Sequence, residues 1–168
     1  MVDSVSKVIL GIDPGFDRIG WAIGQVQHRT VSNIAFGCIQ TSKTETIFKR
    51  YQQIDQELQR LITQYQPQQV AIESLFFFKN QKTVMQVSEA RGVIISTCLR
   101  SGLEIFEFTP LQIKQAVTGY GRATKEQMDK MIRLQLKLNQ EKIIDDAMDA
   151  LGILLTQSVS MSLACGIY

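Results

Sequence analysis

The sequence predicts an α/β domain with a mixed sheet of about five strands flanked by helices. Three strand-like stretches follow one another near the N-terminus, at 8–13, 19–26 and 31–41, and their short connections favour an antiparallel arrangement. A long amphipathic stretch then leads to another short apolar strand. That order is typical of a βαβ crossover, which sets the later strand parallel to an earlier one in the same sheet.

The first strand, 8–13, is apolar until it reaches an Asp-Pro-Gly turn. An aspartate in that setting is ordinary turn chemistry, so Asp13 carries no functional meaning by itself. After the antiparallel strands, apolar residues at spacings of three and four predict a helix from Ile47 to Tyr65 that ends before Pro67.

The strand 70–73, Val-Ala-Ile-Glu, follows this helix and also ends in a carboxylate. If it lies beside the first strand, Asp13 and Glu73 are neighbours at the carboxyl edge of the sheet, where α/β proteins bind their ligands. The remaining elements are predicted in this order: a helix at 84–98, a strand at 105–108, a short helix opening at Pro110, a break at 119–121, a helix capped by Thr124 and running to about Leu138, and a last helix from near Asp145 to beyond Leu155.

Length and composition indicate an ordinary globular protein. A chain of 168 residues suits one domain, which we expect to span 1–168. No apolar run approaches the roughly 20 residues that cross a bilayer, and residues 1–7 lack the pattern of an export signal. We therefore expect a cytoplasmic protein without a membrane segment.

The cysteines and histidine restrict the metals that the chain could bind. Cys38, Cys98 and Cys165 lie far apart, and His28 is the single histidine. This pattern argues against a disulfide framework and against a zinc site. Any metal would be held by carboxylate oxygens, which suit magnesium or manganese.

The net charge of +2 does not by itself indicate a nucleic-acid partner, but the basic residues are unevenly distributed. The segment 114–137 contains six basic residues against two acidic ones. Such a segment is either a solvated helix face or a phosphate-binding surface.

Three aspartates, Asp145, Asp146 and Asp149, open the last predicted helix. Aspartate is favoured in a first turn because it meets free amides and the positive end of the helix dipole. However, Asp149 lies beyond the cap, and residues three or four apart share one face of a helix. Spacing therefore allows Asp149 to pair with either Asp145 or Asp146.

Four carboxylates gathered at one sheet edge would repel each other by about 3 to 4 kcal/mol per close pair at an effective dielectric constant near 20. A fold would hardly collect them without a divalent cation. Two metal ions, one activating water and one stabilising the leaving oxygen, are a well-known arrangement for phosphodiester hydrolysis.

Five motifs together resemble one known family, the RuvC Holliday junction resolvases, which have a ribonuclease H-like fold. The resemblance runs from about Val8 to Thr156. The motifs are GIDPG at 11–15, AIESLFFFKN at 71–80, EARGV at 89–93, KQAVTGYGRATKEQM at 114–128 and DDAMDAL at 145–151.

The resemblance implies roles for particular residues. The catalytic, metal-binding acids of the family fall on Asp13, Glu73, Asp146 and Asp149, which selects Asp146 over Asp145. The resemblance therefore implies a magnesium-dependent endodeoxyribonuclease with two magnesium ions in each active site, where manganese can replace magnesium.

The resemblance also implies DNA contacts. Phe76 aligns with the aromatic residue that stacks on a base at the opened crossover, and Lys114 and Lys125 align with junction-binding lysines. The run of three aromatics, 76–78, would equally suit a strand that continues into the core.

The resemblance implies a homodimer that resolves four-way junctions by paired symmetric nicks in recombination and repair, alongside the RuvA and RuvB branch-migration proteins. The predicted dimer element is the helix 84–99, because Val87, Ile94, Ile95 and Cys98 offer an apolar face. The same pattern equally suits a helix buried within its own domain, and the resemblance to a dimeric family favours the dimer element. The alternatives are a ribonuclease H-like nuclease with another substrate, such as pre-ribosomal RNA, and a junction-binding protein without catalysis. An actin-like ATPase needs two lobes, which this chain is too short to supply.

Overall fold

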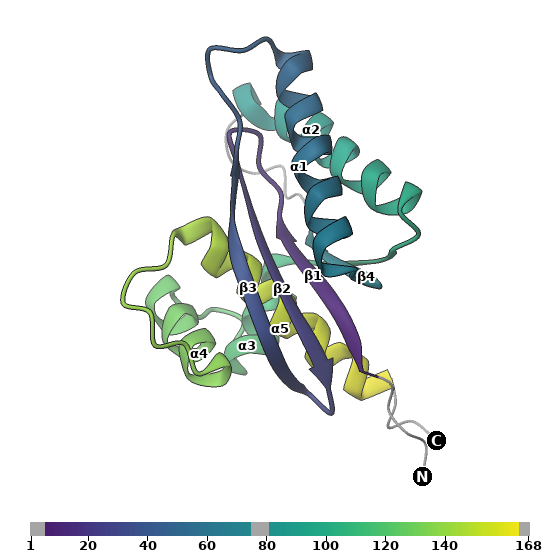
Figure 1. Cartoon of the computed structure of the whole chain (residues 1–168). Helices are drawn as coiled ribbons and strands as arrows, with labels where there is room; N and C mark the ends of the chain where they lie inside the picture. The colour runs from purple at the N-terminus through teal and green to yellow at the C-terminus, as the bar shows by residue number, and fades with distance from the viewer. Residues whose placement is uncertain (1–5, 75–80, 165–168) are drawn as a thin grey trace.

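Five strands form one mixed sheet in the order β3-β2-β1-β4-β5 (Figure 1). The structure is a computed structural model that describes residues 6–74 and 81–164. The strands are β1 (Lys7–Asp13), β2 (Arg18–Gln27), β3 (Thr30–Gln40), β4 (Gln69–Glu73) and β5 (Glu104–Phe108). The first three pair antiparallel, whereas β4 pairs parallel to β1 and β5 parallel to β4, so the predicted mixed sheet is confirmed.

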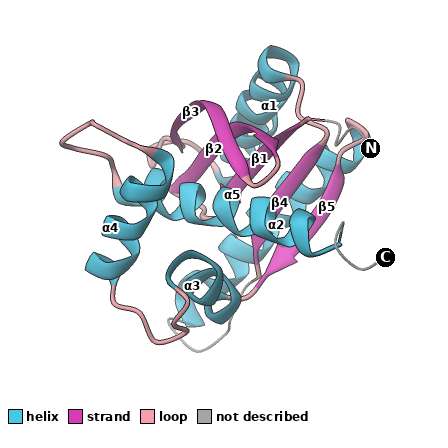
Figure 2. Ribbon diagram, turned by 90° about the horizontal axis from the view of Figure 1, so that it is seen from below, coloured by secondary structure: helices cyan, strands magenta, loops and turns pink. Residues whose placement is uncertain are grey.

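The helices cover both faces of this sheet (Figure 2). They are α1 (Ile47–Tyr65), α2 (Gln81–Arg100), α3 (Pro110–Thr118), α4 (Lys125–Leu136) and α5 (Asp145–Ala164). Side chains of α1 and α2 share one apolar core with one face of the sheet, and those of α3, α4 and α5 share a second core with the other face. Strand β1 contributes side chains to both cores, because successive residues of a strand point to opposite faces of the sheet. Leu10 packs in the core with α1 and α2, and Ile9 packs in the core with α3, α4 and α5.

Threonine caps fix the starts of three helices. Thr46, Thr109 and Thr124 each accept a hydrogen bond from a backbone amide of the first turn, and the last two form complete capping boxes. The predicted starts at Pro110 and after Thr124 are therefore confirmed. Helix α4 ends slightly before the expected Leu138, because Lys137 adopts a left-handed backbone conformation.

Helix α5 lies directly on the sheet because two glycines allow a close approach. A Cβ atom at Gly11 in β1 would lie 2.5 Å from the Ala150 carbonyl oxygen, and one at Gly20 in β2 would lie 1.8 Å from that of Asp146. Larger residues would push the helix away. The first turns of α5 are thus held against the β1–β2 pair, near the carboxyl end of β1.

Helix α2 buries two of the four apolar residues that suggested a dimer face. Ile94 and Cys98 are 1% and 0% exposed and belong to the core beneath α1 and the sheet, so they cannot meet a second chain. Val87 and Ile95 are partly buried against the same core. The amphipathic pattern of this helix is satisfied mainly within its own fold.

Two further sequence expectations can be placed. None of the helices among residues 6–74 and 81–164 is long and apolar enough to cross a membrane. The aromatic run 76–78, including Phe76, lies outside the described residues.

Candidate active site

Asp13 and Glu73 end two neighbouring parallel strands. Ile12 in β1 pairs with Ile72 in β4, so the next residue of each strand is a carboxylate at the same edge of the sheet. Both side chains are partly buried. The expectation that these two acids are neighbours is confirmed by the strand register.

Helix α5 supplies two further acids to this edge. Asp146 lies in its first turn, and Asp149 follows one turn later. Asp149 and Glu73 line a pocket of about 250 Å³ together with Lys114 of α3 and Lys125 of α4. The rest of the pocket wall is formed by Pro110, Ile113, Met128 and Ile153.

The electrostatics of Asp13 reflect its acidic neighbours. Burial, followed by repulsion from Asp149, Glu73 and Asp146, raises the pKa of Asp13 to about 7, although Lys125 partly opposes the shift. The charges of all three acids therefore act on Asp13. At neutral pH without a bound cation, the Asp13 carboxyl is partly protonated.

Glu73 and Asp149 behave in the same way. Burial and the charge of Asp149 raise the pKa of Glu73 to about 7. The Asp149 side chain still reaches solvent, but partial desolvation, with repulsion from Asp145 and Asp146, raises its pKa against the opposing charge of Lys125. The site thus concentrates negative charge that favours either protons or a cation.

Two basic side chains already bind acids of α5. Arg18 Nε donates to Asp146 Oδ2 at 2.7 Å, and Lys125 Nζ lies 2.9 Å from Asp145 Oδ2. Sequence reasoning missed Arg18. Its signal was a lone cation five residues after Asp13, at the start of the next strand, where the antiparallel pairing returns the chain to the same edge.

The four acids lie at one edge of the sheet, but their carboxylates do not converge on a single metal position. Among the described ranges 6–74 and 81–164, no three Asp, Glu, His or Cys side chains converge closely enough to hold one metal ion. Two physical reasons account for this spread: carboxylates repel one another, and Arg18 holds Asp146. The donor set nevertheless fits a hard divalent cation, because it consists of carboxylate oxygens, and burial together with repulsion between the acids raises the pKa values of Asp13 and Glu73.

The two lysines selected from the sequence both reach this pocket. Lys114 is half-buried, and the Lys125 side chain is 60% exposed beside the acids. A sugar-phosphate backbone entering the pocket would therefore meet one lysine side chain from α3 and one from α4.

Comparisons with known proteins give one consistent result. A family model described as crossover junction endodeoxyribonuclease RuvC matches residues 9–157. The crossover junction endodeoxyribonuclease RuvC of Petrotoga mobilis is 49% identical over 145 residues, covering 86% of this chain and 89% of that protein. The RuvC of Thermosipho melanesiensis is 43% identical over 145 residues, covering 86% and 92%.

A solved structure agrees with the sequence matches. Thermus thermophilus RuvC in complex with Holliday junction substrate superposes with a TM-score of 0.88 at 27% identity, covering 94% of this chain and 96% of that one. The expected ribonuclease H-like fold, with its mixed five-stranded sheet flanked by helices, is thereby confirmed.

Proposed function

The chain belongs to the RuvC family of crossover junction endodeoxyribonucleases, and from that membership we propose that it resolves Holliday junctions by paired, symmetric nicks during homologous recombination and repair. The observation that carries the proposal is the meeting of two strand ends and one helix start at an acidic edge, in a chain that matches the family over most of its length.

In this proposal the catalytic and metal-binding residues are Asp13, Glu73, Asp146 and Asp149. Bound magnesium ions, two per site, would supply a Lewis acid for activating water and for stabilising the leaving oxygen, and manganese would substitute. The carboxyls of Asp13 and Glu73, with pKa values of about 7, can lose their protons to solvent near neutral pH when a cation binds in their place. Products would carry 5′-phosphate and 3′-hydroxyl ends.

The DNA contacts follow from charge and position. Lys114 and Lys125 line the acidic pocket, and in this proposal they neutralise the phosphates on either side of the scissile bond, with Lys125 leaving its contact with Asp145. Phosphate contacts of this kind position the backbone without reading its sequence. We assign Phe76 the task of stacking on an unpaired base at the crossover, on the strength of its motif alone.

The assembly follows from the symmetry of the substrate. A four-way junction has two-fold symmetry, so we propose a homodimer that presents one active site to each of two opposed strands. We also propose that the chain forms a single nuclease domain over 1–168, acts in the cytoplasm, and works with the RuvA and RuvB branch-migration proteins.

The test is cleavage of a labelled immobile four-way junction with magnesium, with manganese and with a chelator. The proposal expects two nicks at symmetric positions on opposed strands, ligatable products, and no cleavage in the chelator. Linear duplex and single-stranded RNA of matched length serve as controls. Preferential cutting of the RNA, or cutting of the junction in the chelator, would refute the assignment.

A further inference from the structure

Arg50 is a buried charge that lies outside the acidic site. It belongs to α1 and is 8% exposed. A charged side chain is almost never buried without partners, because its desolvation must be compensated. Its partners therefore indicate which part of the fold it holds in place.

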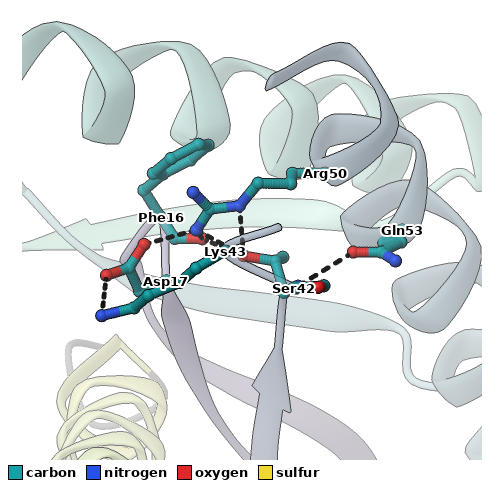
Figure 3. A network of polar contacts seen from close by, with 7 residues as sticks. Phe16, Asp17, Ser42, Lys43, Arg50 and Gln53 are labelled. Atoms are coloured by element: carbon teal, nitrogen blue, oxygen red, sulfur yellow. Dashed lines mark hydrogen bonds and ion pairs between the residues drawn. The ribbon is translucent and has the colours of Figure 1, made fainter. Parts of the chain in front are cut away.

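The guanidinium of Arg50 donates hydrogen bonds to the turn between β1 and β2 and to Thr41, which follows β3 (Figure 3). Arg50 Nη2 forms an ion pair with Asp17 and donates to the Phe16 carbonyl oxygen at 3.4 Å. Nε and Nη2 donate to Thr41 Oγ1 at 2.9 and 2.7 Å. The guanidinium also lies 3.6 Å from the centre of the Phe16 ring.

Thr41 connects the same turn to the end of β3. Its backbone amide donates to the Asp17 carbonyl oxygen at 3.1 Å, and its hydroxyl donates to the Phe16 carbonyl oxygen at 2.9 Å. The second oxygen of Asp17 lies 3.1 Å from Lys43 Nζ. The hydrogen bond from Arg50, with that from Lys43, lowers the pKa of Asp17, so this carboxylate stays ionised.

The position of this turn in the chain connects it to the acidic edge. Asp13 is the last residue of β1, and Arg18, which binds Asp146, is the first residue of β2. Phe16 and Asp17 lie between them. Fixing these two residues fixes the direction in which the chain leaves Asp13 and the point from which Arg18 reaches α5.

We propose that Arg50 is a positioning residue for the acidic cluster: it clamps the β1–β2 turn from α1 and so sets the placement of Asp13 and of the Arg18–Asp146 pair. This inference rests on the proposed function, because it assumes that these acids hold the divalent cation. Supporting residues around a metal site commonly change metal affinity or activity by about 10- to 100-fold when they are replaced.

The experiment compares matched variants of the full chain. Thr41→Val removes the hydroxyl between Arg50 and the turn while keeping the side-chain shape. Thr41→Ser is its counterpart, because serine retains the hydroxyl. Arg50→Gln removes the charge itself. Asp55→Asn is the control, because Asp55 lies on the same helix and binds Arg100 of α2 at 2.6 Å, away from the acidic edge.

Three quantities are measured for each variant: manganese affinity by calorimetry, the single-turnover cleavage rate of a four-way junction, and the junction dissociation constant in a chelator. Arg50→Gln and Thr41→Val should bind manganese about tenfold more weakly and cleave about 10- to 100-fold more slowly. Junction binding should stay within about twofold, and Thr41→Ser should recover most of the loss. Asp55→Asn should lower the melting temperature without changing manganese affinity.

The outcomes separate the two proposals. If the wild-type chain cleaves junctions with metal but Thr41→Val retains wild-type manganese affinity and rate, the positioning role is wrong and the proposed function stands. Equal losses of metal affinity in Asp55→Asn would also overturn it, because the effect would then reflect stability alone. If the wild-type chain binds no manganese, the proposed function fails, and this inference fails with it.

Discussion

Arg18 Nε donates to Asp146 Oδ2 at 2.7 Å, and this bond joins the first residue of β2 to the first turn of α5. Asp146 is one of four acids at this edge. Arg18 therefore binds a carboxylate oxygen to which a divalent cation would also bind. The arginine therefore acts as an internal counter-ion that offsets repulsion among the acids when metal is absent.

This relationship predicts the behaviour of Arg18→Gln. Without metal, the variant should melt at a lower temperature than the wild type, because Asp146 loses its counter-ion. The rise in melting temperature on adding magnesium should be larger than in the wild type, since the cation then relieves more repulsion. Thermal unfolding with and without magnesium checks both signs.

A control for that measurement is Arg60→Gln, which removes an exposed arginine 3.6 Å from Glu57 within α1. It should leave the magnesium response unchanged. An Arg18→Gln protein whose magnesium response equals that of the wild type would contradict the counter-ion role.

The acidic residues give the second prediction. Asp13→Asn, Glu73→Gln, Asp146→Asn and Asp149→Asn should each reduce junction cleavage by more than about 100-fold, since even residues that only support metal ligands cost 10- to 100-fold. Junction binding in a chelator should persist. Single-turnover cleavage and gel-shift binding give the two readouts.

Asp145→Asn is the matched control for these variants. The Asp145 side chain is 78% exposed and pairs with Lys125, so we expect the variant to remain active. Near-wild-type cleavage by Asp146→Asn, together with loss in Asp145→Asn, would reverse the choice between the two neighbouring aspartates.

The third prediction concerns pH. The pKa of Asp13 is about 7 in the folded chain, above its usual value of 3.8, so the folded state binds this proton more tightly than the unfolded state. That contribution to stability is complete below about pH 4 and is lost as the pH rises through 7. Without metal, the free energy of unfolding should therefore fall by on the order of 2 kcal/mol between pH 5 and pH 8.

Urea unfolding at several pH values in a chelator measures this fall. Asp13→Asn should reduce the fall and leave the part that Glu73 contributes, and saturating magnesium should reduce the fall in the wild type, because the cation takes the place of the protons. A wild-type profile that rises over this interval would show that Asp13 does not bind its proton in the folded state.

The local sequence predicts much of this fold because its signals agree with one another. The strand 70–73 follows a helix and therefore pairs parallel with β1, which places Glu73 beside Asp13 as expected. Thr124 followed by Gln127 is a capping box in both sequence and structure. These features depend on short-range chemistry and on one topological rule.

The features that escaped prediction depend on contacts between distant segments. Arg18 and Asp146 are separated by 128 positions, and nothing near Arg18 indicates its partner. Arg50 fits the polar face of its helix in the sequence pattern, yet it is buried against a turn 33 positions earlier. The same reason explains the error over Ile94 and Cys98, whose apolar character suits an interface and a core equally well.

The fourth prediction concerns Lys125. Lys125→Ala should weaken binding to four-way junctions of any sequence, and the salt dependence of binding should decrease by about one phosphate contact. Binding measured over a range of salt concentrations in a chelator gives the slope. Lys130→Ala, a change in the next turn of α4 outside the pocket lining, is the comparison. If the salt dependence of junction binding is unchanged in Lys125→Ala, Lys125 makes no phosphate contact and belongs to a solvated helix face.

The last prediction is the dimer, with its contact surface revised by the structure. Since Ile94 and Cys98 are buried, the outer side of α2 retains Met85, 72% exposed, and Leu99, 59% exposed. They lie about four helical turns apart and so face the same side. The pair Met85→Glu with Leu99→Glu should convert a sedimenting dimer to a monomer, and paired nicks to single nicks, because each junction would then meet one active site at a time.

The comparison for the dimer is Leu134→Glu, which places the same charge on an equally exposed leucine of α4, 68% exposed. It should leave the dimer intact. A second measurement mixes wild-type chains with tagged Asp149→Asn chains and counts the nicks made by the purified mixed dimer, where one nick on one strand is expected. A wild-type chain that sediments as a monomer on the junction, yet still makes both cuts at symmetric positions, would contradict the dimer, because two opposed strands would then be cut in sequence by one site.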